Sequence, residues 1–464
     1  MTATWEHADV INAALDGRDE LVAAAAQQAR RYLAELAERR VAPDEAAVAG
    51  LAELTSELPE QPLGPIEVLR QLDEIGSAAT VASAGPRYFG FVNGGALPIA
   101  VAASWLIAAW DQNCGYRAQT PLGAELEEVA LNWVVELLGL PAGTGGTFVS
   151  GASTAISTCL AVARDQVLIN AGWDALANGL PGAPEIAVVL GEQAHPSVAK
   201  ALGLIGLGRD RALRLPVDEQ GRIIARDLPT LRGPAIVCLQ AGNVNSGASD
   251  PFEPLIAWAH DNGAWVHVDG AFGIWAAAAP ERAAQVAGVQ NADSWATDAH
   301  KWLNTTYDSG IALVRDPQAL HLSMRTSAAY LVSAGHREPA NYTPAMSQRA
   351  RGIECWAVLA SLGRAGIADL VEHACRMATR FATGLAEAGF EILNEVRLNQ
   401  VVAAVADDAD MDAIIERVQR DGTCWAGPTN WRGRRAMRLS VSNWSTTEAD
   451  VDRSIAAIRH AANR

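Results

Sequence analysis

One lysine stands apart by its rarity and its setting. Lys301 is one of only two lysines among the 464 residues, the other being Lys200, and it lies in the largely apolar segment 296–303. An ε-amine that loses its proton can attack an aldehyde and form an imine, whereas an arginine guanidinium stays protonated. We therefore predict that Lys301 forms a Schiff base. Taken alone, the segment is equally the surroundings of a solvated loop lysine before a core tryptophan.

Two further residues whose side chains could take part in a reaction follow short apolar runs. Asp269 ends the sequence His-Val-Asp and is followed by Gly270 and Ala271. Burying a carboxylate without a cationic partner costs several kcal/mol, so we expect Asp269 to face a cation. The small residues after it favour a flat ligand close to the backbone. His195, in Gln-Ala-His-Pro-Ser, suits either a cap at a helix start or a catalytic group at a strand end.

Small residues form a candidate anion site at 150–155, Ser-Gly-Ala-Ser-Thr-Ala. They predict a strand-to-helix turn whose free N–H groups at Ala152 and Ser153 bind an anion. The segment is not a GxxxxGK[ST] loop, and many such turns bind nothing. Combined with the other residues, it meets the requirements of pyridoxal phosphate, because the phosphate needs an anion site, the aldehyde an amine and the ring nitrogen a carboxylate. These would be Ala152 and Ser153, Lys301 and Asp269, with His195 against the ring face.

The elements that must position these residues alternate between two types. From Gly146 onward, helical stretches separate short β-branched runs at 147–149, 186–190, 235–239, 265–268 and 294–297. This alternation predicts an α/β fold with a mainly parallel sheet, whose ligands lie beyond the carboxyl ends of the strands. The candidate residues follow these runs.

The flanking segments predict a three-part chain. Amphipathic helices are expected at 21–36 and 65–76, and since they lack a core of their own they favour a partner subunit. The turn-rich, aromatic segment 85–95 suits a pocket wall, with core packing as the alternative. The apolar run 96–110 predicts a buried helix, and another helix follows Pro121. A small α+β domain is expected from the runs 391–393, 400–404, 423–426 and 435–441 and a last helix near Ser445. The parts are 1–85, helical and dimer-forming; 86–345, large and α/β; and 346–464, small and α+β.

Composition narrows the class of protein. The net charge of −17 argues against nucleic acid and anionic membranes as partners. Six scattered cysteines, without a CxxC pair, argue against a metal site and a disulfide framework. The first residues lack the pattern of a secretory signal, and the run 96–110 is too short to span a bilayer. We expect a cytoplasmic enzyme.

Three of these motifs, in the same order, resemble those of the group II pyridoxal-phosphate decarboxylases, the family of aromatic-amino-acid, glutamate and histidine decarboxylases. Gln193-Ala194-His195 resembles the family's stacking-histidine motif, His267-Val268-Asp269 its pyridinium-aspartate motif, and His300-Lys301-Trp302 its cofactor-lysine signature. The resemblance runs from about Pro86 to the C-terminus. It implies a fold-type I homodimer with the active site at the interface. The expected cofactor contacts are Ala152, Ser153, His195, Asp269, Ala271, Asp298, His300 and Lys301.

The resemblance also implies a reaction, the decarboxylation of an L-amino acid to an amine. Tyr330, in the small-residue segment 325–342, matches the family's lid tyrosine, which returns a proton after carbon dioxide leaves. The alternatives are an aldehyde synthase of the same family, another fold-type I lyase or aminotransferase, and a non-catalytic cofactor-binding protein.

The chain also departs from the family pattern in ways that affect the substrate site. Asp298 stands where many eukaryotic members have asparagine, and the walls near 91–94 and 112–114 are less aromatic than in aromatic-amino-acid decarboxylases. For an acidic substrate, Arg87 or Arg117 would be the partner, although such arginines are more often in surface ion pairs.

Overall fold

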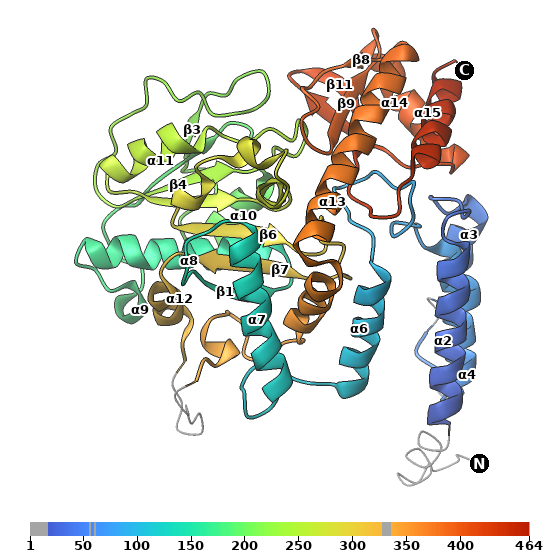
Figure 1. The fold of residues 1–464 in the computed structure, drawn as a ribbon, viewed down its shortest axis with the longest axis horizontal. Helices are drawn as coiled ribbons and strands as arrows, with labels where there is room; N and C mark the ends of the chain where they lie inside the picture. Colours follow the sequence, from blue (N-terminus) through green and yellow to red (C-terminus); the bar gives the residue numbers. More distant parts are fainter. Residues whose placement is uncertain (1–16, 55–56, 60–61, 327–335, 464) are drawn as a thin grey trace.

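A mainly parallel seven-stranded sheet forms the centre of the molecule (Figure 1). The computed structural model describes residues 17–54, 57–59, 62–326 and 336–463. The strand order is β1-β7-β6-β5-β4-β2-β3, and only β7 runs antiparallel to its neighbours. The predicted fold class is therefore confirmed. The strands are β1 (Gly145–Val149), β2 (Ala187–Gly191), β3 (Leu213–Leu215), β4 (Ala235–Gln240), β5 (Trp265–Asp269), β6 (Ser294–Asp298) and β7 (Gly310–Val314).

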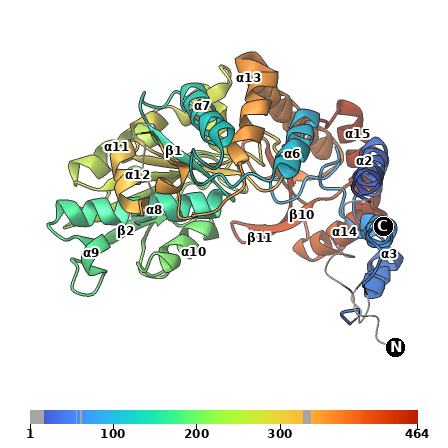
Figure 2. The same cartoon turned by 90° about the horizontal axis from the view of Figure 1, so that it is seen from below.

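Each face of this sheet has its own apolar core, because successive side chains of a strand point to opposite faces. In β4, Val237 and Leu239 pack on one face, and Ile236 and Cys238 on the other. Figure 2 shows α7 and α13 above the sheet, with α8 and α10 below it. The helices here are α7 (Pro121–Leu137), α8 (Ala152–Asn170), α9 (Ala175–Asn178), α10 (Pro196–Leu204), α11 (Phe252–Asp261), α12 (Pro317–Met324) and α13 (Arg351–Glu387).

Two strands of the sheet were not predicted. β3 has only three residues, and its sequence Leu-Arg-Leu gives too short a pattern to stand out. β7 has the apolar sequence Gly-Ile-Ala-Leu-Val and lies between β1 and β6. Gly310 lets this strand approach the start of α8, since a Cβ there would lie 2.4 Å from the Cα of Gly151. The missed strand therefore brings the first turn of α8 next to the end of β6.

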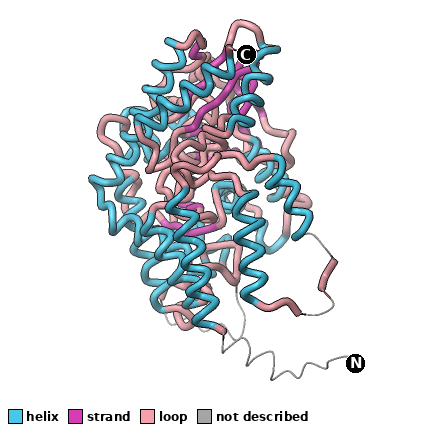
Figure 3. The backbone as a smooth tube through the Cα atoms, turned by 90° about the vertical axis from the view of Figure 1, so that its right-hand side faces the viewer, coloured by secondary structure: helices cyan, strands magenta, loops and turns pink. Residues whose placement is uncertain are grey.

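The N-terminal helices stand along one side of the molecule (Figures 1 and 3). None of them has a buried residue, although the predicted amphipathic segments at 21–36 and 65–76 are largely helical. These helices therefore have most of their apolar surface available for contact with another surface. They are α2 (Arg18–Glu35), α3 (Glu45–Gly50), α4 (Pro65–Gln71) and α5 (Ser77–Ala79).

The prediction of a buried helix at 96–110 is wrong for the chain by itself. In α6 (Pro98–Trp110), only Ala100, Ala103 and Ile107 are buried. Trp105 is 44% exposed and Leu106 53% exposed. The helix is apolar on all sides, but the rest of the chain covers only one of them. Among the described residues, no helix combines the length and apolarity needed to cross a bilayer.

A four-stranded antiparallel sheet with the order β10-β11-β9-β8 follows α13. The strand expected at 423–426 is wrong: Trp425 pairs its backbone with Arg87 and Phe89 instead, and the strand begins two residues later. The division of the chain at 85/86 and 345/346 stays a prediction. The elements are β8 (Glu391–Ile392), β9 (Gln400–Ala404), α14 (Asp408–Asp421), β10 (Gly427–Trp431), β11 (Arg434–Ser440) and α15 (Glu448–Ala462).

Candidate active site

Four loops that carry predicted site residues meet at one edge of the large sheet. β1 and β6 point the same way because β7 is antiparallel to both, and β2, β4 and β5 are parallel to β6. Their carboxyl ends therefore share an edge. The structure gathers there the start of α8 after β1, His195 after β2, Asp269 at the end of β5 and the loop 298–301 after β6.

Asp269 is a buried carboxylate with little to neutralise it. The residue is 7% exposed, and its Oδ1 accepts the backbone N–H of Ala271 at 3.2 Å. Burial raises the pKa of Asp269, while the charges of His195 and Lys301 oppose the rise. A cation held against this carboxylate would favour its ionised form. Ala271 also links two strand ends, because its carbonyl accepts the N–H of Asp298 at 3.0 Å.

His195 is the N-cap of α10 and also borders the site. Its Nδ1 accepts the backbone N–H of Ser197 at 3.3 Å and lies 2.7 Å from the Ser197 hydroxyl. Since Nδ1 accepts, the neutral ring carries its proton on Nε2. Loss of solvation on its inner side lowers the pKa of His195, and Asp269 opposes this effect. The residue as a whole is exposed, which leaves the imidazole accessible to a ligand. The two interpretations of His195 from sequence are thus compatible.

The Lys301 amine is paired with the carboxylate of Asp298. Lys301 Nζ lies 3.0 Å from Asp298 Oδ2, and the lysine side chain is 19% exposed. The other carboxylate oxygen, Oδ1, accepts the backbone N–H of Ala152 at 2.5 Å. Asp298 therefore ties the candidate cofactor lysine to the first residue of α8. Ser153, the next residue of the predicted anion site, is exposed.

His300 supports this pair from the side. Its Nδ1 accepts the backbone N–H of Ser309 at 3.0 Å, which leaves Nε2 to face Asp298 Oδ1 at 3.5 Å. Burial lowers the pKa of His300, whereas Asp298 opposes this effect. The ring stacks on Tyr307 with centroids 4.2 Å apart. His300 therefore borders the ion pair of Asp298 and the candidate cofactor lysine.

The segment 85–95 crosses directly over the loop that contains Lys301, here called the lysine loop. A Cβ on Gly94 would lie 2.0 Å from the carbonyl oxygen of Lys301, so only glycine allows this approach. Next to it, Asn93 Oδ1 accepts the Tyr307 hydroxyl at 2.9 Å. Further along, Trp425 stacks on Tyr88 and on Phe91, with centroids 5.1 and 5.4 Å apart. The segment therefore forms an aromatic wall between the lysine loop and the C-terminal domain.

Arg438 of β11 is a candidate site residue that the sequence did not reveal. Its Nε is buried and has no hydrogen-bond partner among the described residues, and NH1 donates to the Val244 carbonyl at 3.3 Å. Burial lowers the pKa of Arg438, and Tyr88 opposes this effect. Its charge also acts on His195. A carboxylate bound here would supply the missing counter-charge. The only sequence signal was an arginine among the apolar residues of a strand.

Asn304 is a second residue that the sequence did not reveal, and it is fully buried. Its Oδ1 accepts the backbone N–H groups of Gly95 at 2.7 Å and Trp444 at 3.1 Å, and its Nδ2 donates to the Ser442 carbonyl at 3.0 Å. This one side chain joins three distant segments behind Lys301. Nothing in the local sequence marks it.

The two arginines considered for an acidic substrate have partners within the chain. Arg87 is 2% exposed and donates to the carbonyls of Thr423 at 2.7 Å and Arg39 at 3.1 Å. Arg117 forms ion pairs with Glu125 at 2.8 Å and Glu128 at 3.6 Å. Both therefore have structural partners, which favours the structural alternative for these arginines over contact with an acidic substrate. Tyr330 lies outside the described residues.

The arrangement fits pyridoxal phosphate. The buried Asp269 has no cation in direct contact among the described residues, which is what a protonated ring nitrogen would provide. The first turn of α8 has no charged side chain and presents backbone N–H groups to an anion. Lys301 supplies the amine. Within the described residues, no group of acids, histidines and cysteines is placed to hold a metal ion. The fold and these residues define a fold-type I pyridoxal-phosphate enzyme.

Comparison with known proteins gives the family. Residues 51–405 match the pyridoxal-dependent decarboxylase conserved domain, and the chain belongs to this family. It is 26% identical to an aromatic-L-amino-acid decarboxylase of Bacillus atrophaeus, over 86% of this chain and 85% of that protein. It is also 26% identical to a phenylacetaldehyde synthase of Arabidopsis thaliana, over 72% of each.

The fold comparison agrees with the family. The crystal structure of Oryza sativa TDC with PLP and tryptamine superposes with a TM-score of 0.88 and 23% identity, covering 97% of this chain and 98% of that one. The protein is thus a pyridoxal-phosphate-dependent carboxy-lyase that decarboxylates an amino acid, as the sequence predicted.

Proposed function

We propose that this enzyme converts an L-amino acid to its amine at a site built from Lys301, Asp269, His195 and the start of α8. The observation that carries the proposal is the convergence of an amine and an uncompensated buried carboxylate at one sheet edge. Lys301 is paired with Asp298 at 3.0 Å, and Asp269 is 7% exposed and accepts a hydrogen bond from the backbone N–H of Ala271. Pyridoxal phosphate needs both groups, one at each end of its ring.

Each residue has a distinct task in this proposal. When bound, pyridoxal phosphate supplies a sink for the electron pair left as the carboxylate bond breaks. Asp269 holds positive charge at the ring nitrogen, and the His195 imidazole limits the tilt of the ring. The N–H groups of Ala152 and Ser153 bind the phosphate. Lys301 Nζ binds the cofactor aldehyde and, when free, moves protons near it.

The substrate contacts proposed are Arg438 for the carboxylate and the aromatic wall for the side chain. Arg438 Nε has no hydrogen-bond partner among the described residues. Phe91 is 65% exposed while stacked on Trp425, so a ring face is available to a ligand. The substrate class proposed for this wall is an aromatic L-amino acid, for which the Bacillus relative is named. The less aromatic segments 91–94 and 112–114 weaken this choice without excluding it.

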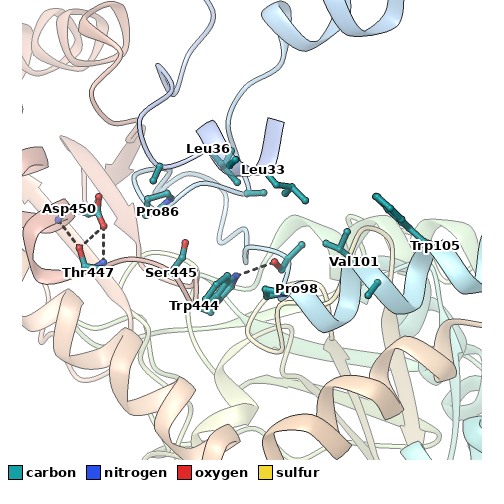
Figure 4. A pocket seen from close by; sticks show the side chains of 15 residues that line it. Leu33, Leu36, Pro86, Pro98, Val101, Trp105, Trp444, Ser445, Thr447 and Asp450 are labelled. Carbon is teal, nitrogen blue, oxygen red and sulfur yellow. Dashed lines mark hydrogen bonds between the residues drawn. The ribbon is translucent and has the colours of Figure 1, made fainter. Parts of the chain in front are cut away.

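We also propose a homodimer, in which a second copy covers an apolar cavity beside α2 and α6 (Figure 4). The cavity has a volume of about 620 Å³ and is lined by Leu33, Leu36, Val101, Trp105 and Trp444, among others. Exposed apolar surface of this extent favours burial against another chain. An active site at that interface, and a cytoplasmic location, are part of the same proposal.

The test starts with the cofactor lysine. Borohydride reduction of the holoenzyme should attach the cofactor to Lys301, detected by mass spectrometry of the peptide, and Lys301→Ala should lose the cofactor absorbance and all turnover. Lys200→Ala is the matched control. A Lys301→Ala protein that keeps the cofactor absorbance and is still labelled on borohydride reduction would overturn the assignment of Lys301 as the cofactor lysine.

Product analysis separates the two reactions known in the family. Carbon dioxide release should be screened with the twenty amino acids, and the product tested for amine against aldehyde and hydrogen peroxide. We expect the amine from wild type. Tyr330→Phe should shift the product toward aldehyde and peroxide if Tyr330 returns the proton. Aldehyde and peroxide in stoichiometric yield from wild type would make the chain an aldehyde synthase.

A further inference from the structure

Asp298 is placed where it opposes the groups that the cofactor needs. It is 3% exposed at the end of β6. One oxygen accepts the Ala152 N–H at 2.5 Å, and the other lies 3.0 Å from Lys301 Nζ. These are one donor of the phosphate site and the amine that binds the aldehyde. A single carboxylate thus occupies a partner at both ends of the cofactor site.

The charged groups around Asp298 do not cancel its repulsion of a phosphate. On its own loop are Lys301 at 3.0 Å and His300, whose Nε2 is 3.5 Å from Oδ1. The first turn of α8 contributes no charge. The loop before β7 adds Tyr307 and Asp308, β5 adds Asp269, and the start of α10 adds His195. Of these acids, Asp308 is paired with Arg351 at 2.9 Å, whereas Asp269 has no cation in direct contact among the described residues. A phosphate that arrives therefore meets repulsion from Asp298 and Asp269 as well as the α8 N–H groups.

We propose that Asp298 restrains cofactor capture as a positioning residue. Its carboxylate repels the phosphate and takes one N–H of α8, and it holds the Lys301 amine in an ion pair. Binding must displace that pairing, so the cofactor is held less tightly than the same site would hold it with a neutral residue. The inference rests on the proposed roles of Lys301 and the start of α8.

Asp298→Asn is the discriminating variant. An asparagine oxygen can still accept the Ala152 N–H, so the link between β6 and α8 is kept while the charge is removed. Asp298→Ser serves as a second variant without charge, in case the carboxamide changes the loop. The matched control is Asp316→Asn, which removes an acid that accepts the N–H of Gln318 at the start of α12. That helix follows the far end of β7, at the opposite edge of the sheet.

Two probes separate the two contacts of Asp298 in cofactor-free protein. Pyridoxamine 5′-phosphate has the phosphate but no aldehyde, and pyridoxal has the aldehyde but no phosphate. By quenching of tryptophan fluorescence, Asp298→Asn should bind pyridoxamine 5′-phosphate about tenfold more tightly than wild type, because one repulsive charge is gone. The rate at which imine absorbance appears with pyridoxal should rise several-fold, because the Lys301 amine is no longer held in its ion pair with Asp298. Asp316→Asn should match wild type in both assays.

The outcomes distinguish this inference from the function on which it rests. If wild type forms a borohydride-stable adduct at Lys301 but Asp298→Asn and Asp298→Ser bind pyridoxamine 5′-phosphate no more tightly, the inference is wrong and the proposed function stands. If wild type forms no adduct at Lys301, both are wrong. Weaker binding by both neutral variants would mean that the carboxylate supports the site, and would also overturn the inference.

Discussion

The sheet edge and the face of α2 and α6 are both incomplete in the single chain, but in opposite chemical senses. At the sheet edge, Asp269 is a carboxylate buried without a cation in contact among the described residues. On the other face, Trp105 and Leu106 are apolar side chains 44% and 53% exposed to water. A charge without a partner calls for a small ionic ligand, whereas an apolar surface without cover calls for a second chain. The contrast supports the proposal that two different partners, a cofactor and a second copy of the chain, complete this molecule.

The largest expected effect concerns the apolar face. The double variant Trp105→Glu, Leu106→Glu should raise the dimer dissociation constant by about 10³-fold or more, because burying each large apolar side chain contributes about 1.5–3 kcal/mol. Sedimentation velocity measures it. Leu204→Glu, at a residue 70% exposed at the end of α10, is the control and should not change the mass. A wild-type protein that sediments as a monomer would remove this half of the comparison.

Next in size is the loss of the unpaired guanidinium. Arg438→Met should lower kcat/KM by about 10²-fold, mostly through KM, because a carboxylate loses its charged partner. Affinity for the product amine, which has no carboxylate, should stay within about twofold on the same basis. Arg435→Met is the control, since Arg435 is paired with Asp412 at 2.6 Å on the surface. An equal loss of affinity for amine and amino acid would assign Arg438 a structural role only.

A smaller effect is expected when Asp269 is replaced. The replacement should favour the cofactor-free fold but disfavour the holoenzyme. Burial raises the pKa of Asp269 in the folded protein, so folding favours its neutral form. The ionised Asp269 carboxylate therefore destabilises the folded protein. This effect is absent at pH values below the pKa of Asp269 in the unfolded chain, and it grows as the pH rises through the pKa of Asp269 in the folded protein. Cofactor-free Asp269→Asn should be more stable than wild type by about 1–3 kcal/mol at pH 8 and equal to it at low pH. Urea denaturation at several pH values measures this.

The cofactor should reverse that result. In the holoenzyme Asp269→Asn removes the partner of the ring nitrogen, so turnover and cofactor affinity should fall while the cofactor-free fold is stabilised. A variant that is destabilised at every pH would show that Asp269 already has its partner within the chain, and the sheet edge would then not be incomplete.

The smallest effect belongs to neither region. Asp174→Ala removes the N-cap of α9, where the Asp174 carboxylate accepts the N–H groups of Leu176 at 3.0 Å and Ala177 at 3.1 Å. It should cost about 1 kcal/mol of stability, with dimer mass and KM unchanged. A change in either property would mean that the two regions are not independent of α9.

The strands that carry the site were predictable because each is a continuous apolar run that ends in a polar or small residue. Asp269 and Asp298 end β5 and β6. The local sequence placed Asp269 at the end of its strand, whereas Asp298 entered through the resemblance to the family, because the predicted run stopped at residue 297. His195 was ambiguous between cap and site because it is both the cap and a residue of the edge. Patterns within ten residues were enough for this part of the molecule.

The rest depends on contacts between distant segments. The run 423–426 looked like a strand, but Trp425 N–H donates to the Arg87 carbonyl at 3.1 Å and its own carbonyl accepts Phe89 N–H at 2.9 Å. The orientation of Arg438 depends on how the second sheet packs against the first. Helix α6 was expected to be buried because its sequence is apolar, and nothing in that sequence says which chain covers it. No local pattern holds this information.

The contacts of Asn304 determine at which stage of synthesis the loop behind Lys301 can be fixed. Asn304 fixes the loop behind Lys301, because its side chain accepts the N–H groups of Gly95 and Trp444 and donates to the Ser442 carbonyl. Arg438 comes from the same late part of the chain. A ribosome that has finished the whole large sheet has therefore not yet supplied the segments that hold the lysine in place. We therefore expect the nascent chain to become competent for catalysis only after residues 438–444 emerge, so fragments that stop short of them should be inactive.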